Sequence, residues 1–355
     1  MPVASITLVS ALIAWVLVMV LGRWLGPRGW MDQPSARKRH DRPVPRVGGL
    51  VLLTVLVGAE LLGGSSLGLS ALERTAVLGM GGMGALDDRF NLRARWKAIV
   101  GLLLAIPLAT GHTWALLHSG INMTLFGLDI PDHALVFFPL LTMWYWAVPH
   151  AFNLIDGLNG LSLGFSCLLL AALSLSPGFL LGAGAAPLWG VLVALLALNF
   201  PRARHFLGDA GSLALGTLFA ILVMNQALPV HRGLALWLMA YPVLDVTTVV
   251  AIRLYTRRPL GRADRSHLHH WLLDHLKGRA WLVTPLLLFL AALPMTRDLD
   301  GPWAKVTSSV GFIALALLAA VVFVDRAIRK PAVPTLLGKP SHPFLNDPSG
   351  SHPQA

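Results

Sequence analysis

Four short polar segments, each bordering a long apolar run, carry the side chains of this chain that are suited to chemistry. They are 84–97, 150–161, 199–216 and 263–275. Their oxygen ligands are Asp87, Asp88, Asn153, Asp156, Asn159, Asn199 and Asp209, and their cations and histidines are Arg95, Lys97, Arg265, His267, His269 and His270. Hard oxygen ligands without a thiolate favour Mg²⁺, with Mn²⁺ as the alternative. Carboxylates, a divalent ion and surrounding cations together indicate phosphoryl transfer.

Paired acids end one apolar run, and a single acid precedes another. Asp87 and Asp88 are adjacent, and two carboxylates so close repel unless a cation is present. Asp209 lies between two glycines just before Ser212. We expect Ser212 to cap the following helix, which leaves Asp209, with Asp88, to hold a metal. The alternative is that these acids only end or cap helices.

Polar residues three positions apart follow in "FNLIDGLNGL". If this turn is helical, Asn153, Asp156 and Asn159 line one face; the alternative is local capping of a turn. Asn199 ends a later apolar run, directly before a phenylalanine and a proline. Capping would explain one polar residue in the turn at 153–159 well, but three on one face poorly.

The histidine segment "DRSHLHH" (264–270) suggests zinc at first sight. Zinc usually has four well-separated ligands, and the one cysteine, Cys167, lies within an apolar run. We therefore interpret His267, His269 and His270, with Arg265, as donors to a phosphate.

The elements that position these residues are membrane spans. The chain is 13% charged and 55% hydrophobic, whereas globular chains carry about 25% charged residues. We predict an all-α integral membrane protein, a polytopic bundle of about 10–11 helices. The expected spans are 5–22, 48–64, 70–86, 98–112, 134–152, 161–177, 186–200, 212–229, 233–252, 281–296 and 307–325. Residues 1–330 would form one catalytic domain, and the proline-rich segment 331–355 a disordered tail.

Positive charge alternates along the predicted topology. Of the 28 Lys and Arg, 24 fall on one side of the membrane, which the positive-inside rule assigns to the cytoplasm. The N-terminus is then outside and the C-terminus inside. The net charge of +11 follows from this topology, so we expect no nucleic-acid partner. The predicted active-site loops are all cytoplasmic: 23–47, 87–97, 153–160, 201–211 and 253–280.

These motifs, together with "MDQPSARKRHDRPVPRVGG" (31–49) and "NFPRARHFLGDAGSLALG" (199–216), resemble the polyprenyl-phosphate N-acetylhexosamine-1-phosphate transferases. The superfamily includes the phospho-N-acetylmuramoyl-pentapeptide transferases. The resemblance covers about 300 residues, with five motifs in the family order. It implies a multi-pass inner-membrane enzyme that transfers a sugar-1-phosphate from a UDP-N-acetylamino sugar to undecaprenyl phosphate. UMP is released, Mg²⁺ is required, and the product starts a cell-envelope polysaccharide such as O-antigen or a teichoic-acid linkage unit.

The resemblance also implies residue roles. Asp87 and Asp88 match the acidic pair that is proposed to activate the lipid phosphate, and Asp209 matches the metal-binding aspartate. Asn153, Asp156, Asn159 and Asn199 match polar positions around the nucleotide and the metal. Arg95 and Lys97 match basic residues that contact the nucleotide. His267, His269 and His270 match the histidine loop near the diphosphate and the sugar. Many members have aspartate at position 159 and asparagine at position 150. The "HLHH" sequence disfavours a muramyl-pentapeptide substrate.

Several alternatives stay open at this point. Asp87 either accepts a proton from the lipid phosphate or orients it, and a single displacement is preferred to an aspartyl-phosphate intermediate. A secondary transporter or ion-coupled protein would use the same buried acids, but its site is expected near the bilayer midplane. An inactive scaffold is the second rival, and a homodimer is an alternative to a monomer.

Overall fold

The protein is built almost entirely of helices. A computed structural model describes residues 2–34, 41–63, 67–118, 123–125, 128–130, 133–175, 182–230, 234–259, 265–299 and 301–329. Its α-helices are α1 (Val3–Leu25), α2 (Gly48–Leu61), α3 (Ala71–Phe90), α4 (Ala94–His118), α5 (Ala134–Ile155), α6 (Leu161–Leu175), α7 (Ala186–Asn199), α8 (Gly208–Val230), α9 (Leu234–Leu238), α10 (Ala240–Tyr255), α11 (Leu268–His275), α12 (Ala280–Met295) and α13 (Pro302–Phe323). Short 3-10 turns span Gly26–Arg28, Gly182–Ala185 and Thr296–Asp298, and a π-helix spans Val324–Arg329.

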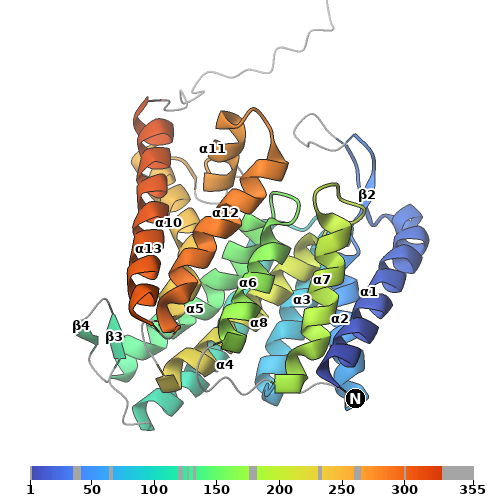
Figure 1. The fold of residues 1–355 in the computed structure, drawn as a ribbon, viewed down its shortest axis with the longest axis horizontal. Helices are drawn as coiled ribbons and strands as arrows, with labels where there is room; N and C mark the ends of the chain where they lie inside the picture. Colours follow the sequence, from blue (N-terminus) through green and yellow to red (C-terminus); the bar gives the residue numbers. More distant parts are fainter. Residues whose placement is uncertain are drawn as a thin grey trace, which may run out of the picture.

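Two small antiparallel hairpins lie at opposite ends of the bundle. β1 (Met31–Asp32) pairs with β2 (Val44–Pro45), and β3 (Met123–Leu125) pairs with β4 (Leu128–Ile130). Figure 1 shows β2 and α11 at one end, with the N-terminus and the β3–β4 hairpin at the other. Two of the basic segments, 23–47 and 253–280, thus have their described elements β2 and α11 at the same end, as the alternating charge pattern predicts.

The predicted fold class is confirmed. Each of the eleven predicted spans coincides with a helix, and five helices are long and apolar enough to cross a membrane. The span at 233–252 is the exception, because it is divided into α9 and α10 at Met239. Pro242 has no N–H to donate to the carbonyl of Leu238, which accounts for the break.

Helix α8 lies at the centre of the bundle. Of its span, 83% is buried inside the protein, against 17% for α1. It packs against α2, α3 and α5, as expected for a helix that is apolar on every side. The peripheral helices instead turn large apolar side chains outward, such as Leu12, Leu103 and Leu317, which is suitable for contact with lipid.

Close packing around α8 depends on glycines. A Cβ on Gly84 of α3 would lie 2.3 Å from the carbonyl oxygen of Asp209, and one on Gly49 of α2 would lie 2.1 Å from the nitrogen of Gly211. The absence of a side chain at these positions lets the three backbones approach. The glycines of α3 therefore bring its acidic end against the start of α8.

The predicted helix ends need two corrections. The span predicted to end at 86 continues to Phe90, so Asp87 and Asp88 lie in the last helical turn. The span predicted to start at 212 begins at Gly208. Ser212 is therefore inside the helix, where its hydroxyl donates to the carbonyl of Gly208 over 3.0 Å, and it does not cap.

Candidate active site

Asp88 caps the N-terminus of α8 from another helix. Its Oδ1 accepts from the backbone N–H of Asp209 over 3.0 Å, and its Oδ2 accepts from that of Ala210 over 2.9 Å. A negative charge is favourable at a helix N-terminus because it meets unpaired N–H groups and the positive end of the dipole. Gly208, with φ +73°, leaves room for this carboxylate. Asp88 thereby holds Asp209 in position.

Asp209 is the centre of a polar cluster that four helices build. Lys97 of α4 donates from Nζ to Asp209 Oδ2 over 2.6 Å and to Asp87 Oδ2 over 2.9 Å. Asn153 of α5 donates from Nδ2 to Asp209 Oδ1 over 2.9 Å and to the hydroxyl of Ser212 over 3.0 Å. Two carboxylates thus share one ammonium group, although they are 122 positions apart in sequence. We call Asp87, Asp88, Lys97, Asn153 and Asp209 the acid cluster.

The acid cluster fits a divalent cation. Asp87 Oδ1 is buried without a hydrogen-bond partner among the residues that the structure describes, and buried polar atoms are rarely left unpaired. Asp87 and Asp209 direct carboxylate oxygens toward the Lys97 ammonium, so the site already accommodates positive charge. One or two carboxylates, completed by phosphate and water oxygens, are the ligands that Mg²⁺ usually takes.

Asp156 belongs to the same electrostatic environment. It lies just beyond the end of α5 and is half-buried. Burial, together with the negative charges of Asp209 and Asp88, raises the pKa of Asp156 well above its usual value. Asp156 therefore lies within the electrostatic influence of the carboxylates of Asp88 and Asp209.

The three polar residues of 153–159 do not share one helical face. Helix α5 ends at Ile155, so the spacing that would align them is lost in the turn. Asn153 contacts Asp209, whereas Asn159 donates from Nδ2 to the carbonyl of Pro201 over 3.1 Å. The prediction of a helical turn over these residues is wrong, because the helix ends before the glycines at 157 and 160.

Asn199 links two loops of the site. Its Oδ1 accepts from the backbone N–H of Gly160 over 2.6 Å, and its Nδ2 donates to the carbonyl of His205 over 2.8 Å. Both bonds are buried, and Asn199 is 5% exposed. The side chain therefore fixes the turn after α5 to the segment that leads into α8.

We expect Asn199→Ala to lower the free energy of unfolding by about 3 kcal/mol, because it leaves two buried backbone groups unpaired. Asn159→Ala is the matched control, since it removes one exposed hydrogen bond and should cost less than about 1 kcal/mol. Thermal unfolding in detergent measures both. Equal melting temperatures for the two variants would contradict this interpretation of Asn199.

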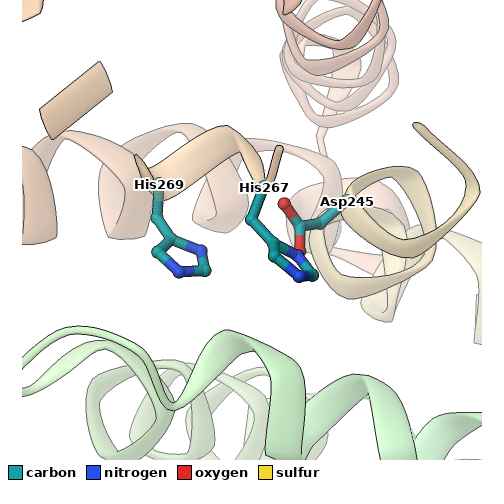
Figure 2. Close-up of side chains that lie close together, drawn as sticks. All are labelled: Asp245, His267 and His269. Atoms are coloured by element: carbon teal, nitrogen blue, oxygen red, sulfur yellow. The ribbon is translucent and has the colours of Figure 1, made fainter. Parts of the chain in front are cut away.

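The histidine segment lies beside the turn that follows α5. Figure 2 shows His267 and His269 side by side, with Asp245 of α10 next to His267. His267 Nδ1 donates to Asp245 Oδ2 over 2.7 Å, and the N–H of Leu268 donates to Asp245 Oδ1 over 2.7 Å. A Cβ on Gly157 would lie 2.5 Å from His269 Nε2, so His269 lies against the turn that carries Asp156.

Burial keeps two of these histidines neutral. It lowers the pKa of His269 to about 3 and that of His270 to about 4, with the neighbouring histidines contributing in both cases. A neutral imidazole still donates one N–H to a phosphate, but it supplies no charge. His269 and His270 can therefore act as the expected donors to a phosphate only through neutral hydrogen bonds.

The predicted basic contacts are distributed unequally. Lys97 is in the acid cluster, while the exposed Arg95 lies over the ring of Trp96 at 5.4 Å. Arg265 donates to Asp274 Oδ1 over 2.7 Å at the surface of α11. Arg46, which the sequence analysis did not select, lies 3.9 Å from Asp88 Oδ1.

Asp245 was also missed, although one local feature indicates it. It is the one acid in the apolar run "YPVLDVTTVVAI" (241–252), and ionisable residues within membrane spans are functional by default. Its partners His267 and Leu268 are more than 20 positions away. Their contact with Asp245 became visible only in the folded chain.

Fold and site together define a polytopic helical membrane protein with an acid cluster suited to a divalent cation. The chain matches the model of "Glycosyl transferase family 4" over residues 73–227, a range that contains the whole acid cluster. It is 29% identical to a probable undecaprenyl-phosphate N-acetylglucosaminyl 1-phosphate transferase of Bacillus subtilis, with 75% of this chain and 76% of the relative covered. An undecaprenyl-phosphate alpha-N-acetylglucosaminyl 1-phosphate transferase of Yersinia pestis is 29% identical, with 68% and 69% covered. A decaprenyl-phosphate N-acetylglucosaminephosphotransferase of Mycobacterium tuberculosis is 28% identical, with 90% and 89% covered.

These findings confirm the resemblance seen in the sequence. The chain is similar to polyprenyl-phosphate N-acetylglucosamine-1-phosphate transferases, and the similarity extends over most of its length. Its homologues are phosphotransferases that, by their names, act on undecaprenyl or decaprenyl phosphate. The histidine segment lies outside the range that the family model matches.

Proposed function

We propose that this protein transfers an N-acetylamino-sugar-1-phosphate, GlcNAc-1-phosphate by default, from a UDP-sugar to undecaprenyl phosphate and releases UMP. The observation that supports this most directly is the acid cluster, in which Asp87 and Asp209 share the ammonium of Lys97. The names of the relatives provide the substrate class. The reaction would be the first membrane step of a cell-envelope polysaccharide.

The acid cluster suggests how the charges are managed. A diphosphate and a lipid phosphate repel each other, so neutralisation must precede attack. Asp209, with Asp87 and Asp88 beside it, would hold Mg²⁺ or Mn²⁺, which when bound would neutralise the diphosphate and polarise the phosphorus. Lys97 would then be released from the carboxylates to contact phosphate oxygens.

Asp87 would orient the attacking lipid phosphate or accept its proton. A phosphomonoester has a second pKa of about 6, so little proton transfer is needed at neutral pH, and orientation is the larger contribution. Asp88 keeps its cap on α8, which fixes the backbone of Asp209. Asn153 donates to Oδ1 of Asp209, the carboxylate oxygen that Lys97 does not contact.

The remaining predicted residues would contact the nucleotide and sugar. Asp156 and Asn159 border the acid cluster, and Asn199 fixes the loop on which they lie. Across this turn, the histidine segment supplies His267, His269 and His270, with Arg265 and Arg95 nearer the surface. We place all of them at the cytoplasmic face of the inner membrane, where soluble UDP-sugar and a lipid headgroup both have access.

The direct test is UMP release by the purified protein with Mg²⁺, undecaprenyl phosphate and a panel of UDP-N-acetylamino sugars. We expect release with at least one sugar, dependence on the lipid acceptor, and loss of activity when the divalent ion is chelated. If the protein elutes as one folded species and releases no UMP with any of the sugars, the proposal is refuted. The sugar that gives the highest kcat/KM identifies the donor.

A further inference from the structure

A second group of metal-ligating side chains lies outside the acid cluster. Asp245 comes from α10, His267 is the residue before α11, and His269 is in the first turn of α11. One ligand atom from each lies within 4.8 Å of the other two, and all three residues are buried. Figure 2 shows both imidazoles on the same side of α11, with the carboxylate of Asp245 close to His267.

His269 points to a ligand at this place. It is 0% exposed, and both of its ring nitrogens are buried without a hydrogen-bond partner among the described residues. An imidazole has one donor and one acceptor nitrogen, and buried polar atoms of this kind are nearly always satisfied. A leucine would fill an apolar position without burying unpaired nitrogens. We therefore expect an ion or a polar ligand to contact the ring nitrogens of His269.

The neighbouring contacts orient the other two side chains in advance. Asp245 Oδ1 is fixed by the backbone N–H of Leu268, and Oδ2 accepts from His267 Nδ1. When the proton of His267 moves from Nδ1 to Nε2 of the same ring, Nδ1 and Oδ2 both present lone pairs, with no net change in protonation. Both atoms are then available to bind an ion.

We propose that Asp245, His267 and His269 form a binding site for a divalent transition-metal ion, with Zn²⁺ as the expected occupant. The sequence disfavoured zinc because the histidine segment alone lacks well-separated ligands, and in the folded chain Asp245 of α10 supplies a ligand from another helix. Imidazole nitrogens and one carboxylate suit Zn²⁺, whereas Mg²⁺ prefers oxygen ligands alone. Three protein ligands leave a fourth position open, as in sites where zinc also contacts water or substrate. The site thus differs in ligand chemistry from the acid cluster.

The position of this ion gives it a role in the proposed reaction. His269 lies against Gly157, in the turn that carries Asp156, so the open coordination position would be near the donor substrate. His267 and His269 would then contact a phosphate or sugar oxygen through the ion, and His270 would donate to that oxygen directly. This role rests on the proposed function, but the site itself does not.

Co²⁺ is the probe for this site, because it replaces Zn²⁺ and absorbs visible light strongly when it is four- or five-coordinate. The full-length protein is stripped with a chelator and titrated with Co²⁺ in the absence of nucleotide and lipid. We expect one equivalent to bind with such a spectrum and to be displaced by Zn²⁺. His269→Ala and Asp245→Asn should weaken binding at least about tenfold.

Two variants serve as matched controls. His275→Gln changes an exposed histidine on the same helix, and Asp209→Asn changes the acid cluster; both should keep the spectrum. A wild-type protein without this absorption would overturn the site, and so would a spectrum lost in Asp209→Asn but kept in His269→Ala. UMP release with Mg²⁺ is measured separately, so failure of the transferase and failure of the metal site give different results.

Discussion

Asp209→Asn should lower the rate of UMP release by about a thousandfold or more. The substitution keeps the volume of the side chain and leaves the start of α8 intact, because Asp88 caps it through the backbone. It removes the charge that Lys97 and Asn153 both contact. Chemistry should therefore be lost while folding is kept. The measurement is kcat at saturating UDP-sugar and lipid, with thermal unfolding alongside.

Glu60→Gln is the control for this prediction. Glu60 is an acid on α2 that pairs with Arg74 of α3 at a partly exposed position, away from the acid cluster, and its loss should change the rate less than about twofold. If Asp209→Asn retained activity within tenfold of the wild type, Asp209 would not be the central ligand of the reaction.

Gly84→Ala should unfold or severely destabilise the protein, by more than about 3 kcal/mol. A Cβ at this position would lie 2.3 Å from the carbonyl oxygen of Asp209 and 2.5 Å from the nitrogen of Ala210. Backbone atoms cannot yield as a flexible side chain does, so α3 and α8 must separate. The Asp88 cap would break with them, and activity would fall together with the melting temperature.

The same helix supplies an internal control. A Cβ on Gly82 would have nothing within 4 Å, and alanine is favoured over glycine in a helix by up to about 1 kcal/mol. Gly82→Ala should therefore match or exceed the wild type in thermal stability and activity. If both alanine variants were equally stable, close contact between α3 and α8 would not depend on Gly84.

Local pattern predicted the helices well but their polar ends poorly. The apolar runs predicted where the helices lie, and five of the described helices are long and apolar enough to cross a membrane. The ends predicted at 86 and 212 are wrong, because polar residues continue α3 and begin α8. In the structure, Asp87 and Asp88 continue α3, and the cap of α8 is Asp88, which is 120 positions before Gly208. A cap from another helix leaves no local signal.

The candidate site shows the same limit. Residue type and spacing selected Asp87, Asn153 and Asp209, because oxygen ligands are recognisable in sequence, and the family resemblance added Lys97. Their pairing was not predictable, and neither was the contact between Asp245 and His267, because each depends on how separate helices pack.

Hydropathy and residue chemistry are local properties, so the amino-acid sequence was enough to predict a multi-span helical membrane protein and the kinds of ligand it offers. Which ligands meet is visible only in the folded chain: Lys97 lies between Asp87 and Asp209, Asp88 lies on the α8 backbone, and His269 lies beside Gly157. These contacts depend on backbone approach at Gly84, Gly49 and Gly157, and such distances are set by packing between segments rather than by any single segment.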